Sequence, residues 1–245
     1  MFRLSFIITC VAVSLASCGS GGGGGGGGGT AAVVNQNANG YWSGSTTTPG
    51  YSSTPTHGLF NDGDFVAING EINEFYKGSY TIDDDDISAS AKGYYLNGPL
   101  IGTGTLSGVV NSKGTLKATV TANGVVSDLD LVYQTALSER SISLSDVAGS
   151  WSGYIPGLSF TISINSSGSF NASGSDGCNV SGTLSIPQSG SNMIKGDLSV
   201  SGTYCNATGD YSGLGMLGDW VGTNDLLVFG YANEQYGFGY VASRN

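Results

Sequence analysis

The strongest constraint on the fold is a two-residue alternation of apolar and polar side chains. Leu158, Phe160, Ile162 and Ile164 alternate with polar residues, and a turn-forming segment follows at 165–168. Successive side chains of a β-strand point to opposite faces, so this alternation is typical of a strand with one buried face. Further alternating segments occur at 65–68, 76–82, 87–95, 103–109, 115–121, 125–133, 180–186, 194–200 and 236–241, and the last of these forms a predicted closing hairpin with the apolar run 226–231. The sequence therefore predicts an all-β protein of antiparallel meanders, with a helical turn only at 143–148.

One short sequence pattern occurs twice. Glycine, any residue, tryptophan, serine and glycine follow one another around Trp42 and again around Trp151. This recurrence favours a duplicated unit of about 100 residues, and chance repetition in a Gly- and Ser-rich chain is the alternative. We predict a first β-unit at 41–142 and a second at 143–245, each a small antiparallel barrel or sandwich. Barrels are favoured because closure removes unpaired strand edges.

Residues 1–17 have the pattern of a secretory signal peptide. Arg3 is their only charged residue, and an apolar run occupies 4–16. A run of this length is typical of a signal-peptide core and is shorter than the roughly 20 apolar residues that span a bilayer. The sequence therefore predicts export.

The apolar run ends in Leu15, Ala16, Ser17 and Cys18. This ending resembles the lipobox of bacterial lipoproteins, in which a diacylglyceryl group is attached to the cysteine and cleavage occurs just before it. The resemblance implies that Cys18 carries palmitate-type acyl chains that anchor the protein in a membrane. Gly19 stands where that family places an aspartate for inner-membrane retention, so the resemblance implies the outer membrane. The alternative is an ordinary signal peptide cleaved near Ala16.

Residues 18–40 form a Gly-rich segment without charge, and glycine is unbroken at 21–29. Such a segment buries too little apolar surface to offset the entropy of ordering, so we predict a flexible tether. A lipid anchor followed by poly-glycine resembles the tether of surface-displayed lipoproteins such as transferrin-binding and factor-H-binding proteins. The resemblance implies display at the cell surface as one location for the folded part.

The residues around Trp151 also resemble the opening of two barrel families. Residues 144–151 resemble the Gly-x-Trp opening of lipocalins, and 160–164 with 168–170 resemble the opening strands of avidin-type barrels. In both families the tryptophan packs across the closed end of the barrel, which implies that role for Trp151 and for Trp42. Lipocalins also stack an arginine on this tryptophan, and Arg140 and Arg244 are the candidates. The biotin-binding residues of avidin-type proteins cannot be located, so biotin binding is not implied.

Cys178 and Cys205 are the cysteines that remain once the signal peptide is removed and Cys18 is lipidated. An even pair in an oxidising compartment predicts a disulfide. The alternatives are a metal pair and a nucleophilic cysteine. Both would need further thiols or a histidine in this half of the chain, which contains neither.

Four carboxylates are consecutive: Asp83, Asp84, Asp85 and Asp86. In a hairpin turn they would be solvated, which is the simpler interpretation. Their crowding also suggests a low-affinity Ca²⁺ site, because Ca²⁺ binds several oxygen ligands. We predict no other metal site and no cofactor.

The charge balance excludes nucleic acid as a partner. Eight Lys and Arg stand against 18 Asp and Glu, and phosphate recognition needs clustered basic residues. The single histidine, His57, lies beside proline and glycine and is interpreted as a loop residue rather than a base. No nucleophile or carboxylate pair has the spacing of a catalytic motif, so no catalytic residue is predicted.

Tyr236, Phe238 and Tyr240 alternate with Gly237 and Gly239 near the end of the chain. In a strand the aromatic side chains share one face and the glycines the other. The aromatic face would line a ligand cavity or form a contact surface, and a filled barrel interior is the alternative.

These features predict a non-enzymatic lipoprotein of the bacterial outer membrane. It would bind a protein or a small apolar ligand at the envelope or the cell surface. A periplasmic structural or assembly factor that pairs through sheet edges is an alternative, and an enzyme is the least favoured one.

Overall fold

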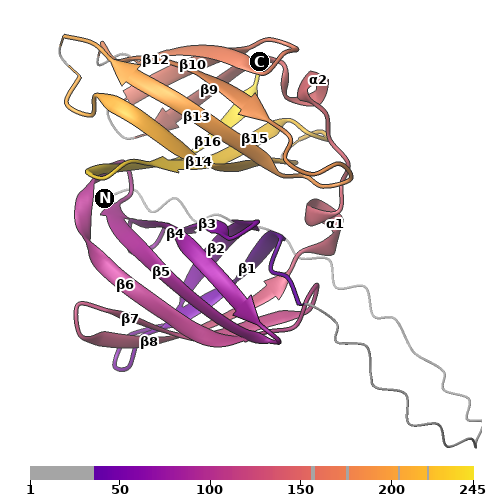
Figure 1. The fold of residues 1–245 in the computed structure, drawn as a ribbon. Coiled ribbons are helices and arrows are strands. Elements are labelled where there is room, and N and C mark those ends of the chain that lie inside the picture. Colours follow the sequence, from indigo (N-terminus) through magenta and orange to yellow (C-terminus); the bar gives the residue numbers. More distant parts are fainter. Residues whose placement is uncertain (1–35, 156–157, 175–176, 204, 220) are drawn as a thin grey trace, which may run out of the picture. The chain divides into compact units, whose positions relative to one another are not determined.

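The alternating segments become strands that follow one another along the chain. A computed structural model describes residues 36–155, 158–174, 177–203, 205–219 and 221–245. Within these residues the chain forms sixteen β-strands and two short helices (Figure 1). The first eight strands are β1 (Gly40–Thr47), β2 (Thr54–Asn61), β3 (Asp64–Asn69), β4 (Glu74–Asp83), β5 (Asp86–Tyr95), β6 (Gly98–Val110), β7 (Thr115–Ala122) and β8 (Val125–Tyr133). Two helices follow, α1 (Thr135–Ser138) and α2 (Leu144–Val147). The last eight strands are β9 (Gly149–Ile155), β10 (Leu158–Ile164), β11 (Ser169–Gly174), β12 (Asn179–Ser185), β13 (Ile194–Ser201), β14 (Gly209–Gly218), β15 (Leu226–Ala232) and β16 (Tyr236–Arg244).

Each set of eight strands closes into an antiparallel barrel. In the first barrel every strand pairs with the next one along the chain, and β8 returns to pair with β1. The second barrel has the same order, and β16 returns to pair with β9. The prediction of an all-β fold with two small barrel units is therefore confirmed. Closure leaves no unpaired edge strand among the described strands of either barrel.

The two repeated tryptophans begin their barrels in the same way. Gly40 and Gly149 have φ angles of 132° and 136°, a region that glycine adopts without steric cost. Two residues later, Trp42 and Trp151 are fully buried. Each indole N–H donates to the carbonyl oxygen four residues earlier, at 2.6 Å for Trp42 and 2.9 Å for Trp151. Both side chains thus plug the end at which the chain enters the barrel, as the resemblance to lipocalins and avidin-type barrels implied.

Aromatic side chains pack against one another in the interior of the first barrel. Phe60 packs against Trp42, Phe65 and Tyr80, with ring centroids 6.5, 5.3 and 5.5 Å away. Tyr133, the last residue of β8, meets the edge of Trp42 at 5.3 Å. These rings belong to one buried cluster with aliphatic residues from β5 to β8.

Strand β2 departs from the sequence analysis. The prediction that His57 lies in a loop is wrong, because His57 pairs with Ser43 of β1 and Ile68 of β3. Pro55 in the same segment masks the strand pattern. It lies beyond the β2–β3 ladder, which begins at His57, so the missing N–H of proline costs no hydrogen bond to β3.

The linking helices agree in part with the prediction. Helix α2 occupies the helical turn predicted at 143–148, and the Asp146 carboxylate accepts the backbone N–H of Ser143 at 2.8 Å. Helix α1 was not predicted, because four residues carry no detectable periodicity. Ser138 of α1 accepts the backbone N–H of Tyr41 through its hydroxyl and that of Asn192 through its carbonyl. Neither described helix is long and apolar enough to cross a bilayer.

The two barrels contact each other within one compact unit, Val34–Asn245. Tyr236 and Gly237 of β16 pair with Pro99 and Gly98 of β6. A buried cluster joins side chains of both barrels: Leu59, Val66, Phe75, Tyr94, Met193, Leu214, Met216 and Ala232. Polar contacts also join the two barrels. The Lys77 ammonium donates a hydrogen bond to the Ser212 hydroxyl at 2.6 Å. Ion pairs join Lys195 to Asp64 and Lys92 to Glu234.

Candidate functional site

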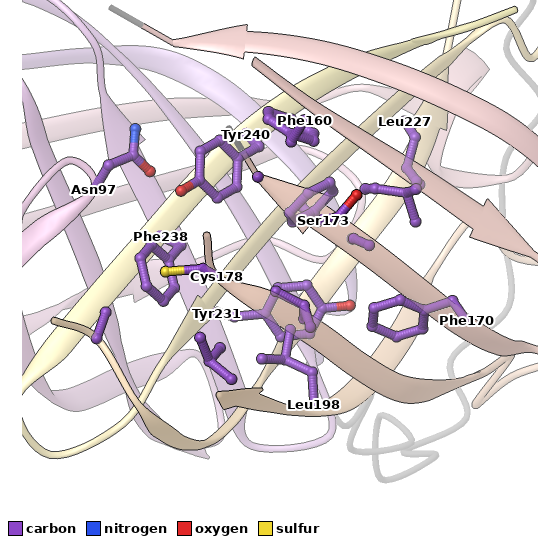
Figure 2. Close-up of a pocket in the computed structure, with 18 of the residues that line it drawn as sticks. Asn97, Phe160, Phe170, Ser173, Cys178, Leu198, Leu227, Tyr231, Phe238 and Tyr240 are labelled. Atoms are coloured by element: carbon purple, nitrogen blue, oxygen red, sulfur yellow. The ribbon is translucent and has the colours of Figure 1, made fainter. Parts of the chain in front are cut away.

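The interior of the second barrel holds a cavity of about 300 Å³ (Figure 2). Its floor is formed by Ile164 and Phe170, on the side of the barrel that Trp151 closes. Its mouth lies at the opposite ends of the strands, where Gly174 and Asn206 line it. We call this space the second-barrel cavity.

One wall of the cavity is aromatic and comes from β15 and β16. Phe238 and Tyr240 lie nearly parallel, with an interplanar angle of 18° and ring centroids 5.9 Å apart. Phe229 contacts Tyr240 at 5.4 Å, and Tyr236 contacts Phe238 at 6.1 Å. Tyr236, Phe238 and Tyr240 remain partly exposed although they face the barrel interior. The structure therefore places all three predicted aromatic residues at the wall of an open space rather than in a filled core.

The facing wall is aliphatic and comes from β10, β12 and β13. It consists of Ile162, Val180, Leu184, Ile194, Leu198 and Val200. None of the described side chains that line the cavity carries a charge. An ionised ligand group placed inside would lose its hydration without gaining an ion pair, so the cavity favours an uncharged, apolar occupant.

Tyr231 contributes a hydroxyl group to the cavity interior. The residue is 4 % exposed and its ring packs 5.5 Å from that of Phe229. Burial, with a smaller contribution from the charge of Asp197, raises the pKa of Tyr231 far above its ordinary value. The group is therefore a neutral phenol at any physiological pH.

A disulfide joins two loops at the mouth of the cavity. Cys178 and Cys205 are bonded, with their Cα atoms 5.0 Å apart, which confirms the predicted pair. Cys178 lies between β11 and β12, and Cys205 lies between β13 and β14. Because Cys178 also lines the cavity, the cross-link holds part of the mouth in place.

One face of strand β16 lines the cavity, and the other face packs against the first barrel. A Cβ atom on Gly237 would lie 2.7 Å from the Phe75 ring and 2.7 Å from the Tyr94 ring. A Cβ atom on Gly239 would lie 2.8 Å from Leu96. The glycines that alternate with the aromatic residues therefore admit first-barrel side chains to the outer face of β16.

The first barrel also reaches the mouth of the cavity. Asn97, in the turn between β5 and β6, lines the cavity, and its side-chain oxygen accepts the backbone N–H of Gly239 at 3.1 Å. Figure 2 shows Asn97 on the same side of the cavity as Tyr240. The site is therefore built from both barrels.

The two candidate arginines have different positions. The guanidinium of Arg244 lies over the Trp151 ring, as the resemblance to lipocalins implied for one of them. Arg140 instead donates to both carboxylate oxygens of Asp219, at 2.7 and 2.6 Å. It lies in the segment between α1 and α2, which is held against the loop after β14.

The structure gives the calcium hypothesis no support. Asp84 and Asp85 form the two-residue turn between β4 and β5, and Asp83 and Asp86 flank it, all exposed. Asp83 and Asp86 are cross-strand partners on one face, and Asp84 and Asp85 lie in the turn beyond them. No group of three or more His, Cys, Asp or Glu side chains in the described part of the chain is placed to hold a metal ion.

His57 lies outside the cavity, on the outer face of the first barrel. Its Nδ1 atom is 2.8 Å from the Tyr41 hydroxyl, and the two rings are stacked 6.1 Å apart. Burial lowers the pKa of His57 below its ordinary value. The histidine is therefore a neutral packing residue near physiological pH.

The predicted signal peptide, Leu15 to Cys18 of the lipobox and residues 18–35 of the tether lie outside the described residues. The sequence analysis assigned only Tyr236, Phe238 and Tyr240 to a cavity face, and it did not identify the polar groups of Tyr231 and Asn97. Tyr231 belongs to an apolar run in which alternation is not visible, and Asn97 comes from the other barrel, to which no pattern in the chain connects it. Comparison of the chain with protein-family models, with curated proteins and with solved structures finds no match.

Proposed function

We propose that this protein is a non-enzymatic, outer-membrane-anchored lipoprotein whose second barrel binds a small, uncharged, apolar ligand. The observation that carries the proposal is the cavity of about 300 Å³, with one aromatic and one aliphatic wall and no charged lining residue among those described. Small-molecule sites are typically concave, mostly apolar spaces of about 300 Å³ or more with a few polar groups. The second-barrel cavity has these properties.

The envelope location rests on the N-terminal sequence. The lipobox at Leu15 to Cys18 and the glycine run at 21–29 support an acylated cysteine and a long tether. A tethered barrel would hold its cavity in the aqueous space beside the membrane, where it could take up an apolar molecule and shield it from water.

Two observations bear on the other candidate functions. An assembly factor that pairs through sheet edges needs an open edge, whereas both described barrels are closed by β8 with β1 and β16 with β9. An enzyme needs reactive groups at its cavity, and His57 lies elsewhere. Both observations favour binding as the function.

The proposal is tested with N-phenyl-1-naphthylamine, an uncharged dye whose fluorescence rises in an apolar site. We expect saturable binding to the purified full chain. Ala172 is a partly buried residue of the cavity wall on β11, so Ala172→Phe should fill the cavity and abolish binding.

The matched control is Ser163→Phe, which places the same ring on an exposed position of β10. It should leave dye binding unchanged. The proposal is wrong if the wild-type chain does not bind the dye, or if Ala172→Phe folds with an unchanged circular dichroism spectrum and still binds it.

A further inference from the structure

The polar groups of the second-barrel cavity indicate what kind of apolar molecule it takes. Several other tyrosine hydroxyls have hydrogen-bonding partners in the described chain, among them the following four. Those of Tyr94 and Tyr211 donate to backbone carbonyls at 2.6 Å, that of Tyr80 donates to Asn39 at 2.9 Å, and that of Tyr41 pairs with His57. These partners follow the rule that buried tyrosines satisfy their hydroxyl groups.

The hydroxyl of Tyr231 has no hydrogen-bond partner among the described residues, although the residue is only 4 % exposed. The hydroxyl of Tyr133 in the first barrel, 8 % exposed, has none either. No fully enclosed side-chain nitrogen or oxygen in the described chain lacks a partner. The Tyr231 oxygen must therefore border the space of the cavity rather than sit sealed in the wall. In Figure 2 it points across the cavity toward the side of Phe170.

The aromatic wall adds a second restriction. Phe238 and Tyr240 offer adjacent, nearly parallel ring faces, and Phe160 meets Tyr240 at 5.0 Å. Flat rings pack against such a surface by offset stacking or edge contacts, and this interaction adds to the burial of apolar area. A flexible alkyl chain would gain only the free energy of burying its apolar surface, without ring stacking, and it would lose more conformational entropy on binding than a rigid ring system.

We propose that the ligand of the second-barrel cavity is an uncharged molecule of about two fused rings that carries a carbonyl-type oxygen, to which the Tyr231 hydroxyl donates a hydrogen bond. The size follows from the cavity volume of about 300 Å³, near the lower end for small-molecule sites. This inference rests on the proposed function, because it names the ligand class of the same cavity.

Four probes that displace the bound dye separate the parts of this proposal. They are 2-acetylnaphthalene, 2-ethylnaphthalene, 2-naphthoate and the ring-free ketone 2-dodecanone. We expect 2-acetylnaphthalene to bind about fivefold more tightly than 2-ethylnaphthalene, since one neutral hydrogen bond distinguishes them. The naphthoate should bind at least about 100-fold more weakly than the ketone, because no positively charged side chain of the described residues lines the cavity to offset the loss of hydration of its carboxylate. The ring-free ketone should also bind more weakly than 2-acetylnaphthalene.

Tyr231→Phe tests the donor. In this variant 2-acetylnaphthalene and 2-ethylnaphthalene should bind equally, while the affinity for 2-ethylnaphthalene stays at the wild-type value and shows that the cavity is intact. Tyr211→Phe is the matched control. It removes a hydroxyl that is already bonded to a backbone carbonyl and should preserve the fivefold difference.

The outcomes distinguish this inference from the proposed function. If the dye and 2-ethylnaphthalene bind but the ketone gains nothing, or if Tyr231→Phe keeps the difference, the hydrogen-bonded ligand class is wrong and the apolar cavity stands. Equal binding of naphthoate and ketone, or stronger binding of 2-dodecanone, overturns the ligand class in the same way. If neither the dye nor any probe binds, the proposed function itself fails.

Discussion

The guanidinium carbon of Arg244 lies 4.4 Å from the ring centroid of Trp151. The two residues are also direct cross-strand partners between β16 and β9. In the first barrel the same register brings Tyr133 opposite Trp42. Each barrel is thus closed by a tryptophan at the end where the chain enters it. The Arg244 guanidinium lies over the Trp151 ring in the second barrel, and Tyr133 makes an edge-to-face contact with Trp42 in the first.

Arg244→Ala should destabilise the protein by about 1 to 2 kcal/mol. The variant loses a cation–π contact and hydrogen bonds to the carbonyl oxygens of Ala148 and Asp146. Urea unfolding followed by circular dichroism measures the change. Lys117→Ala removes one positive charge from an exposed pair with Asp130 and should change stability by less than about 0.5 kcal/mol. Equal effects of the two variants would refute a stabilising role of the stack.

Removing the disulfide should destabilise the folded chain by roughly 3.5 kcal/mol on the chain-entropy model, given the separation of 27 residues between Cys178 and Cys205. The measurement is urea unfolding of the Cys178→Ala/Cys205→Ala variant beside the oxidised wild type. Reduced and alkylated wild-type protein should unfold at a similarly low urea concentration. Identical midpoints for oxidised and reduced protein would contradict this prediction.

The stability of the protein should fall with pH below about 6.5 because of His57. Burial lowers the pKa of His57 in the folded chain, so between 6.5 and that lower pKa the unfolded chain binds a proton that the folded chain does not. The stabilisation is fully present above the unfolded pKa and is lost as the pH drops toward the folded pKa.

His57→Gln isolates this effect, because the chain contains a single histidine. Melting temperatures of wild type and variant should diverge in their pH dependence between about pH 8 and pH 5.5, with the flatter profile for the variant. Parallel profiles would show that His57 does not titrate differently in the folded and unfolded states.

Gly237→Ala should destabilise the contact between the barrels by about 1 to 3 kcal/mol, since the added methyl meets the rigid rings of Phe75 and Tyr94. Gly70→Ala is the matched control, because a Cβ atom there meets nothing within 4 Å. The control should be neutral to within about 0.5 kcal/mol. If thermal melts show the same small change for both, the outer face of β16 is not tightly packed.

Cys18→Ala should move the protein from the membrane pellet to the soluble fraction of fractionated cells. The expectation follows from the lipobox at Leu15 to Cys18, because acyl chains provide the membrane affinity. Mass spectrometry of the purified wild-type chain should find the modified cysteine at its N-terminus. A variant that still pellets with membranes, or an unmodified thiol, would overturn the lipid assignment.

Much of the fold could be predicted from local patterns, because strand alternation and turn residues act over a few neighbours. Strands such as β10 and β16 follow directly from alternating side chains. β2, β14 and α1 were not among the predicted elements. Pro55 weakens the strand pattern of β2, and α1 is a four-residue helix held by Ser138 contacts to Tyr41 and Asn192 that are distant in sequence.

The candidate site was predictable only in its aromatic face. The alternation around Phe238 placed three aromatic side chains on one side of a strand. The glycine at 237 on the other side is explained only by the structure, because Phe75 and Tyr94 of the first barrel pack where its side chain would be. Asn97 and the unpartnered hydroxyl of Tyr231 depend on contacts across the barrel interior and between barrels. Such contacts leave no periodic signal in one sequence.

By itself, the sequence determined the strand pattern, the cysteine pair and the repeated glycine–tryptophan start, because these depend on residue type and short spacing. Only the tertiary structure decided that the inward-facing side chains of the second barrel leave a cavity between them. The strand order and the tryptophan plug do not fix this cavity, because both barrels share them. It depends on how facing side chains from distant strands fill the barrel interior, which is a property of the closed barrel.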